Sequence, residues 1–120
     1  MVNQEDVRDN LTGPFTSICV PFNQDGRIDY DGLRSELDFD LAAGSKTIIL
    51  TAGDSHYICM GDDEIAQVTR VTCEHVAGRA MVIAADRYHA TARARAFAEF
   101  ANQTGADMVM CMPCDWAQSA

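Results

Sequence analysis

A glycine, a short turn and a buried apolar run follow one another three times in this chain. In order, the units are Gly44 before residues 47–50, Gly78 before 81–84 and Gly105 before 108–111. A glycine in this position typically closes a helix, because it adopts the left-handed C′ conformation without a steric penalty. A run that is apolar on both faces is typical of a strand in a parallel sheet covered by helices. Each unit therefore predicts the end of a helix and the start of a parallel strand.

Amphipathic helices are predicted before each of these strands. The first begins at an Asp29 cap, the second follows Asp62 and Asp63, and the third follows a turn at residues 89–91. Their apolar stripes are Tyr30, Leu33, Leu37 and Leu41; Ile65, Val68, Thr72 and Val76; and Ala94, Phe97, Ala98 and Ala101. One more strand is expected at residues 15–20, with a turn at 21–26 after it.

The predicted order is thus four parallel strands with a helix between each consecutive pair. This α/β alternation gives either an open doubly wound sheet or part of a (βα)₈ barrel. A complete barrel needs roughly 250 residues, whereas this chain has 120. We expect a single domain over residues 1–120 that corresponds to the N-terminal half of a TIM barrel.

Composition narrows the classes of partner. A formal net charge of −9 repels phosphate backbones, so no nucleic acid is expected as a partner. No apolar run approaches the roughly 18 residues of a membrane helix, and the first residues are acidic, so neither a membrane span nor a secretory signal is expected. Five cysteines, an odd number spread through apolar segments, fit reduced thiols better than a disulfide framework. These features favour a cytoplasmic protein.

Several short motifs resemble one enzyme family. They are Gly13-Pro14-Phe15-Thr16-Ser17, Val20-Pro21-Phe22, Asp25-Gly26-Arg27-Ile28-Asp29, Leu50-Thr51-Ala52-Gly53-Asp54, Val76-Ala77-Gly78-Arg79 before residues 81–84, and Thr104-Gly105-Ala106-Asp107 before Pro113. In this order they are similar to the dihydrodipicolinate synthase/N-acetylneuraminate lyase family of class I aldolases. In that family a first strand ends in Thr-Pro-Phe and a Gly-Thr-Thr-Gly-Glu loop follows the second strand. The resemblance runs from about residue 13 to residue 113.

The resemblance implies a (βα)₈ barrel with lyase or aldolase activity on pyruvate or another 2-keto acid, through a Schiff base to a lysine on the sixth strand. It implies no cofactor and no metal. The sequence ends before the fifth and sixth strands, so the Schiff-base lysine and its neighbouring tyrosine are expected to be missing. Lys46, the only lysine, falls at the opposite end of the strands from the expected site, where we expect a solvated turn residue.

The same resemblance assigns site residues. Thr51 takes the place of the first threonine of the loop, and is expected to be catalytic by relaying a proton; without the resemblance it reads equally well as a residue that ends a strand. The expected substrate-binding residues are Ser17, Thr51, Ala52 and Gly53, together with Arg87, which is a candidate from its own chemistry and not from the resemblance. Ala52 departs from the pattern, because the second threonine is a carboxylate contact and alanine leaves only a backbone N–H.

Other polar residues follow the predicted second and third strands. Asp54 takes the place of the glutamate, and His56 and Tyr57 are candidate acid–base groups, although packing or a subunit contact is the commoner role of such a pair. Arg87 is a candidate carboxylate clamp and Tyr88 a candidate proton relay. An ion pair between Arg87 and Asp86, or a helix cap, is an equally good interpretation. The family usually has small residues at these positions.

Cys111-Met112-Pro113-Cys114 is a CxxC motif at a strand end. A thioredoxin-like site begins this way but needs a following helix to lower the pKa of a thiolate. A structural zinc site needs two more ligands.

Three hypotheses follow. The first is the N-terminal half of a Schiff-base aldolase whose partner is a small-molecule 2-keto acid. The second is a non-catalytic half-barrel that binds a ligand or forms a homo-oligomer, because its outer strands have open edges. The third is a CxxC thiol oxidoreductase.

Overall fold

The protein is a half-barrel of four parallel strands and the helices that connect them. The computed structural model describes residues 3–87 and 90–112. The strands are β1 (Thr16–Ser17), β2 (Thr47–Ile49), β3 (Met81–Ala85) and β4 (Met108–Met110), adjacent in that order. The helices are α1 (Gln4–Asn10), α2 (Tyr30–Ala42), α3 (Asp62–Val76) and α4 (Thr91–Thr104), with a 3₁₀ turn, η1 (Tyr57–Cys59). The predicted alternation of parallel strands and helices is confirmed.

Capping interactions explain where the helices begin and end. The Asp29 carboxylate accepts a hydrogen bond from the Gly32 N–H at 3.0 Å, which starts α2 at the predicted place. Helix α3 starts earlier than predicted: Gly61 is its N-cap residue, so Asp62 and Asp63 lie in the first turn and not before it, and the Gly61 N–H donates to the Glu64 carboxylate at 2.8 Å. Gly105 ends α4 with φ of 98°, a conformation that a residue with a Cβ rarely adopts.

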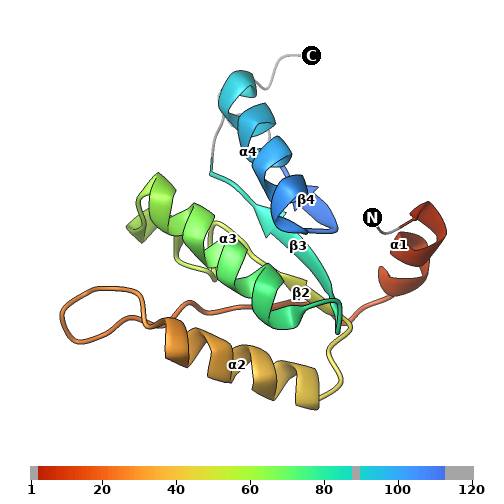
Figure 1. The fold of residues 1–120 in the computed structure, drawn as a ribbon, viewed down its shortest axis with the longest axis horizontal. Coiled ribbons are helices and arrows are strands. Elements are labelled where there is room, and N and C mark those ends of the chain that lie inside the picture. The colour runs from red at the N-terminus through yellow and green to blue at the C-terminus, as the bar shows by residue number, and fades with distance from the viewer. Residues whose placement is uncertain (1–2, 88–89, 113–120) are drawn as a thin grey trace.

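The three long helices cover one face of the sheet. Figure 1 shows α2, α3 and α4 side by side on the same side of the strands. The core between the layers is continuous, and its fully buried members include Ile18, Leu33, Leu37, Ile48, Leu50, Ile65, Val68, Val76, Ala84 and Ala101. The apolar stripes of the helices and alternate residues of the strands thus meet, as the sequence pattern predicts.

The opposite face of the sheet is defined by the strand register. Partner residues in parallel strands share a face, and Ser17 pairs with Ile49, Thr47 with Met81, and Ile49 and Met108 each with Ile83. We call this surface the inner face; it comprises Ser17, Thr47, Ile49, Met81, Ile83 and Met108. None of α2, α3 and α4 covers it, and in the described residues β1 and β4 are the edges of the sheet.

Two further details differ from the sequence prediction. Helix α1 was not expected; Asn3 caps it by accepting hydrogen bonds from the N–H groups of Glu5 and Asp6, both at 2.8 Å. None of its residues is buried, so it lacks the apolar stripe that periodicity detects. The second difference is the length of β1, which covers two residues where six were expected. No helix in the described residues is long and apolar enough to cross a membrane.

Candidate functional site at the carboxyl ends of the strands

The loop after β2 is closed by a set of short hydrogen bonds around Thr51. The Thr51 N–H donates to Ser55 Oγ at 2.9 Å, and the Asp54 N–H donates to Thr51 Oγ1 at 3.0 Å. The Gly53 carbonyl accepts from the His56 N–H at 2.9 Å. The loop therefore has a defined conformation that depends on its own side chains, as expected of a polar turn built on serine and threonine.

Thr51 is oriented by these contacts. Its hydroxyl oxygen accepts from Asp54, which leaves the hydroxyl proton for a further acceptor. Thr51 follows Ile49 by two residues, and the alternation along the strand directs it to the inner face. Ala52 is half-buried against the core and Gly53 is exposed. A threonine that offers a proton at the carboxyl end of a parallel strand is suited to binding or proton relay.

Ser17 lies beside this loop. It is the last residue of β1, and the next residue, Ile18, accepts a hydrogen bond at its carbonyl from Ser55 Oγ at 2.8 Å. The Ser17 hydroxyl oxygen is buried and, among the described residues, has no hydrogen-bond partner. Buried hydroxyls usually have one. The structure therefore places Ser17 at the end of β1 and Thr51 in the loop after the adjacent strand β2, and Ser55 joins that loop to Ile18, the residue after Ser17.

Arg87 is held by other groups. Its Nη1 donates to the Tyr57 carbonyl at 3.0 Å and its Nη2 to the Asp62 carboxylate at 2.9 Å. Arg93 also pairs with Asp62. Arg87 therefore links the end of β3 to η1 and to the start of α3, while its side chain stays 33% exposed. Its predicted ion pair with Asp86 is not the contact observed, and its role in substrate binding stays a prediction.

His56 and Tyr57 have different surroundings. His56 is exposed, with φ of 59°, and its ring packs edge-on against Phe22 at 6.2 Å between centroids. Tyr57 is fully buried in the core, and burial raises the pKa of its phenol well above the ordinary value. A buried phenol that resists ionisation is suited to packing and not to proton transfer. This agrees with packing as the commoner role of a His-Tyr pair.

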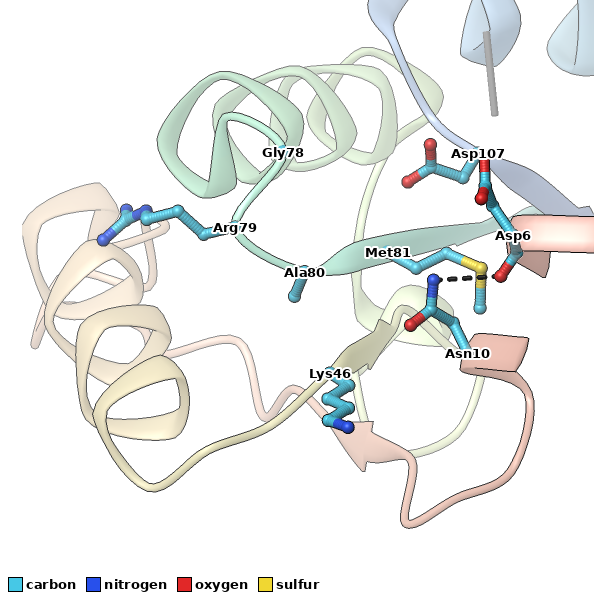
Figure 2. Close-up of a pocket in the computed structure, with 8 residues that line it drawn as sticks. All are labelled: Asp6, Asn10, Lys46, Gly78, Arg79, Ala80, Met81 and Asp107. Carbon is cyan, nitrogen blue, oxygen red and sulfur yellow. Dashed lines mark hydrogen bonds between the residues drawn. The ribbon is translucent and has the colours of Figure 1, made fainter. Parts of the chain in front are cut away.

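Lys46 lies at the other end of the strands. It is exposed, directly before β2, and lines a cavity of about 430 Å³ between α1 and the starts of the strands. Figure 2 shows the residues around this cavity, with the Lys46 ammonium group directed away from Asp6 and Asp107. A Schiff-base lysine must be desolvated, so the prediction of a solvated turn lysine fits the structure.

The remaining candidates lie partly outside the described residues. Tyr88 and Cys114 are among these, so the proton relay and the CxxC hypothesis stay predictions, and Cys111 is an exposed free thiol. Within residues 3–87 and 90–112, no group of three or more His, Cys, Asp or Glu side chains is arranged to hold a metal ion.

Ser55 is a structural residue of this loop that no pattern in the sequence indicates. In the sequence it is one small polar residue among several in a loop, and loop serines are usually exposed. In the structure it is fully buried and bonded at both ends.

Comparison with known proteins assigns the family. Residues 10–114 match the dihydrodipicolinate synthetase family. The 4-hydroxy-tetrahydrodipicolinate synthase of Azoarcus sp. (strain BH72) is 39% identical over 98 residues, which are 80% of this chain and 33% of that enzyme. The L-2-keto-3-deoxyarabonate dehydratase of Azospirillum brasilense is 36% identical over 101 residues, 84% of this chain and 33% of that enzyme.

Solved structures agree with the sequence relatives. The dihydrodipicolinate synthase of Bacillus clausii superposes with a TM-score of 0.82 at 31% identity, over 89% of this chain and 36% of that one. This chain thus spans about a third of the length of the proteins it matches. The match in sequence covers most of the chain, and the strands and helices follow the same order: the chain belongs to the dihydrodipicolinate synthetase family.

Proposed function

We propose that this chain forms the part of a 2-keto acid site that a Schiff-base aldolase or lyase builds from its first four strands. Thr51 is the catalytic residue, as a proton relay, and binds substrate together with Ser17, Gly53 and the backbone of Ala52. The observation that carries the proposal is the Thr51 hydroxyl: its oxygen accepts one hydrogen bond, from the Asp54 N–H, and keeps its proton and its second lone pair for a relay to a substrate oxygen.

Two further observations support the site. The Ser17 hydroxyl is buried without a partner in the described residues, on the face of the sheet that Thr51 also faces. The position is the carboxyl end of parallel strands, where barrel enzymes place their catalytic groups. Arg87 supplies positive charge at the same end and is proposed to attract a carboxylate, although two of its donors are already used.

The covalent step needs a lysine that this chain does not supply. Lys46 is exposed at the opposite end of β2, so we propose that the Schiff base forms on a lysine outside these residues. The chain alone should bind a 2-keto acid weakly and should not form the covalent adduct. Pyruvate is the simplest such acid.

Binding is tested by titrating the labelled chain with pyruvate and following amide chemical shifts. We expect shifts confined to Ser17, Thr51 and Gly53, and smaller shifts with L-lactate, which lacks the keto group. Thr51→Val, which keeps the shape but removes the hydroxyl, should lose most of the response. Thr104→Val is a matched control, because its hydroxyl bonds only the Phe100 carbonyl within α4. Equal responses to pyruvate and lactate would contradict recognition of the keto group.

The covalent step is tested by adding borohydride to the pyruvate mixture and measuring the intact mass. We expect no increase in mass. A stable adduct at Lys46 would show that the chain forms a Schiff base by itself, which would overturn this part of the proposal.

A second candidate function, self-association, is favoured by Ile49 and Met108, which are only half-buried on the inner face, and by the edges that β1 and β4 leave open among the described residues. Unpaired strand edges promote pairing with another chain. Light scattering tests it: we expect a homo-oligomer that Ile49→Glu on the inner face dissociates. Phe39→Glu is the control, since Phe39 is 72% exposed on α2, on the other side of the sheet. A wild-type monomer at all concentrations would contradict association.

A further inference from the structure

The hydrogen-bond ladder between β1 and β2 stops one step before the register predicts. Thr16 pairs with Ile48 and Ser17 with Ile49, so the next pair is Ile18 with Leu50. In a parallel ladder, Ile18 then bonds the residues on either side of Leu50. The first of these bonds is present, because the Ile18 N–H donates to the Ile49 carbonyl at 3.2 Å. The second would join the Thr51 N–H directly to the Ile18 carbonyl.

The Ser55 hydroxyl occupies the place of that second bond. The Thr51 N–H donates to Ser55 Oγ at 2.9 Å, and Ser55 Oγ donates to the Ile18 carbonyl at 2.8 Å. A hydroxyl accepts one hydrogen bond and donates the other, so both backbone groups are satisfied through one oxygen. The Thr51 N–H and the Ile18 carbonyl are therefore bridged by the Ser55 oxygen, whereas in a regular ladder they would bond each other directly. This also explains why β1 ends at Ser17 although Ile18 and Val20 are buried as a longer strand would require.

We propose that Ser55 is a positioning residue that holds β1 and β2 apart at the mouth of the half-barrel and thereby sets the position of Thr51. Its side chain is fully buried, so no solvent competes for the two bonds. The role rests on the proposed function, in which Thr51 contacts the substrate and Ser55 does not.

The consequence of removing the hydroxyl follows from the geometry. In Ser55→Ala, the Thr51 N–H and the Ile18 carbonyl lose their shared partner, and leaving two buried groups unpaired is costly. Direct bonding between them completes the ladder and draws Thr51 toward β1. The acceptor bond from Asp54 to Thr51 then changes as well, because Asp54 lies in the same five-residue turn.

The test is a through-hydrogen-bond NMR coupling between the Thr51 amide nitrogen and the Ile18 carbonyl carbon. We expect none in the wild type, because a hydroxyl lies between the two groups, while the coupling from Ile18 nitrogen to the Ile49 carbonyl carbon serves as the positive control. In Ser55→Ala the Thr51–Ile18 coupling should appear. Ser55→Thr, which keeps the hydroxyl, should again show none. Detection of the coupling in the wild type would overturn the proposal, even if Ser55→Ala does not fold.

Ser45→Ala is the matched control. Ser45 Oγ hydrogen-bonds Thr16 Oγ1 at 2.6 Å, so it also links the segments of β1 and β2, but at the other end of the strands. Loss of the Ser45 hydroxyl should leave the Thr51 amide chemical shift unchanged, and the Thr51–Ile18 coupling should stay undetected, as in the wild type. A change as large as that of Ser55→Ala would point to general loosening of the strand pair and against a specific role of Ser55.

Pyruvate titration separates this proposal from the proposed function. If wild type binds, Ser55→Ala should bind about tenfold more weakly, the scale of one hydrogen bond, and Ser55→Thr should recover the affinity. Unchanged affinity and an unchanged Thr51 amide in Ser55→Ala would overturn the positioning role. If the wild type does not bind pyruvate, the proposed function fails, and the coupling alone decides whether Ser55 sets the position of Thr51.

Discussion

The carboxylate of Asp62 and the guanidinium of Arg87 are 2.9 Å apart and join the first turn of α3 to the end of β3. Arg87 also donates to the Tyr57 carbonyl. Its side chain therefore contacts both ends of the segment 57–62, which follows the Thr51 loop. Such a link is stronger than an exposed pair, because hydrogen bonds between charged groups gain when partly desolvated.

We expect Arg87→Gln to lower the free energy of unfolding by about 1–2 kcal/mol, since it removes a charge-assisted bond and a bond to a carbonyl while Asp62 keeps Arg93 as a partner. Urea denaturation measures the change. Arg95→Gln is the control: the Arg95–Glu99 pair is 81% and 62% exposed, and its loss should cost less than about 0.5 kcal/mol. Equal effects of the two variants would show that the Arg87 link is merely a surface contact.

Ala52 is the position where the loop departs from the family pattern, which has a threonine there. Restoring the hydroxyl tests whether this position contacts the carboxylate of the substrate. We expect Ala52→Thr to tighten pyruvate binding by about tenfold, because a hydroxyl donated to a carboxylate is a charge-assisted bond. The amide titration of Thr51 measures it. Ala52→Val is the control for shape, as it adds the same volume without a donor. If both variants bind alike, the carboxylate is not held at this position.

The long helices and the strand order could be predicted from the sequence because both depend on local pattern. Leu33 and Leu37 repeat at helical spacing, Asp29 caps their helix, and Gly105 closes another. Helix α1 has no such signal, because Val7 is its single apolar residue and cannot form a stripe, and only the cap at Asn3 indicates it. A helix or strand that buries an apolar face can be predicted from its sequence pattern, whereas a helix without such a face leaves no periodic pattern.

The site could be predicted only in part. The position of Thr51 at the end of a strand followed from pattern and resemblance, since parallel strands present their carboxyl ends together. The partners of Arg87 and the burial of Ser55 are tertiary facts: Asp62 is 25 residues from Arg87, and Ile18 is 37 from Ser55. Nothing in a local sequence pattern selects one acceptor among many at such separations.

Substitution of Tyr57 distinguishes a packing role of this side chain from a role in substrate binding. Its hydroxyl is buried next to the Thr69 side chain, without a well-formed hydrogen bond in the described part of the chain. We expect Tyr57→Phe to raise the free energy of unfolding by about 1 kcal/mol, because a desolvated hydroxyl that makes no well-formed hydrogen bond is removed. Tyr30→Phe, at a half-buried position, should change it by less than about 0.5 kcal/mol. Weaker pyruvate binding in Tyr57→Phe without loss of stability would instead indicate a role in the site.

Cys73 should make the protein sensitive to alkali. Burial, followed by the nearby carboxylates of Asp107 and Glu74, raises the pKa of its thiol from 9.0 to about 11. Because the folded pKa is the higher one, the unfolded chain loses this proton first, and stability present below about pH 9 is lost as the pH rises toward 11. The raised pKa of the Tyr57 phenol acts in the same direction at higher pH.

Urea denaturation at pH 8, 9 and 10 measures the slope of stability against pH, and Cys73→Ala should make that slope shallower. The comparison uses slopes and not single values, because the smaller side chain also leaves space in the core and lowers stability at every pH. Cys59→Ala is the control, since Cys59 is exposed on η1 and its removal should leave the slope unchanged. A slope in Cys73→Ala as steep as in the wild type would mean that ionisation of this thiol is not what couples folding to alkali.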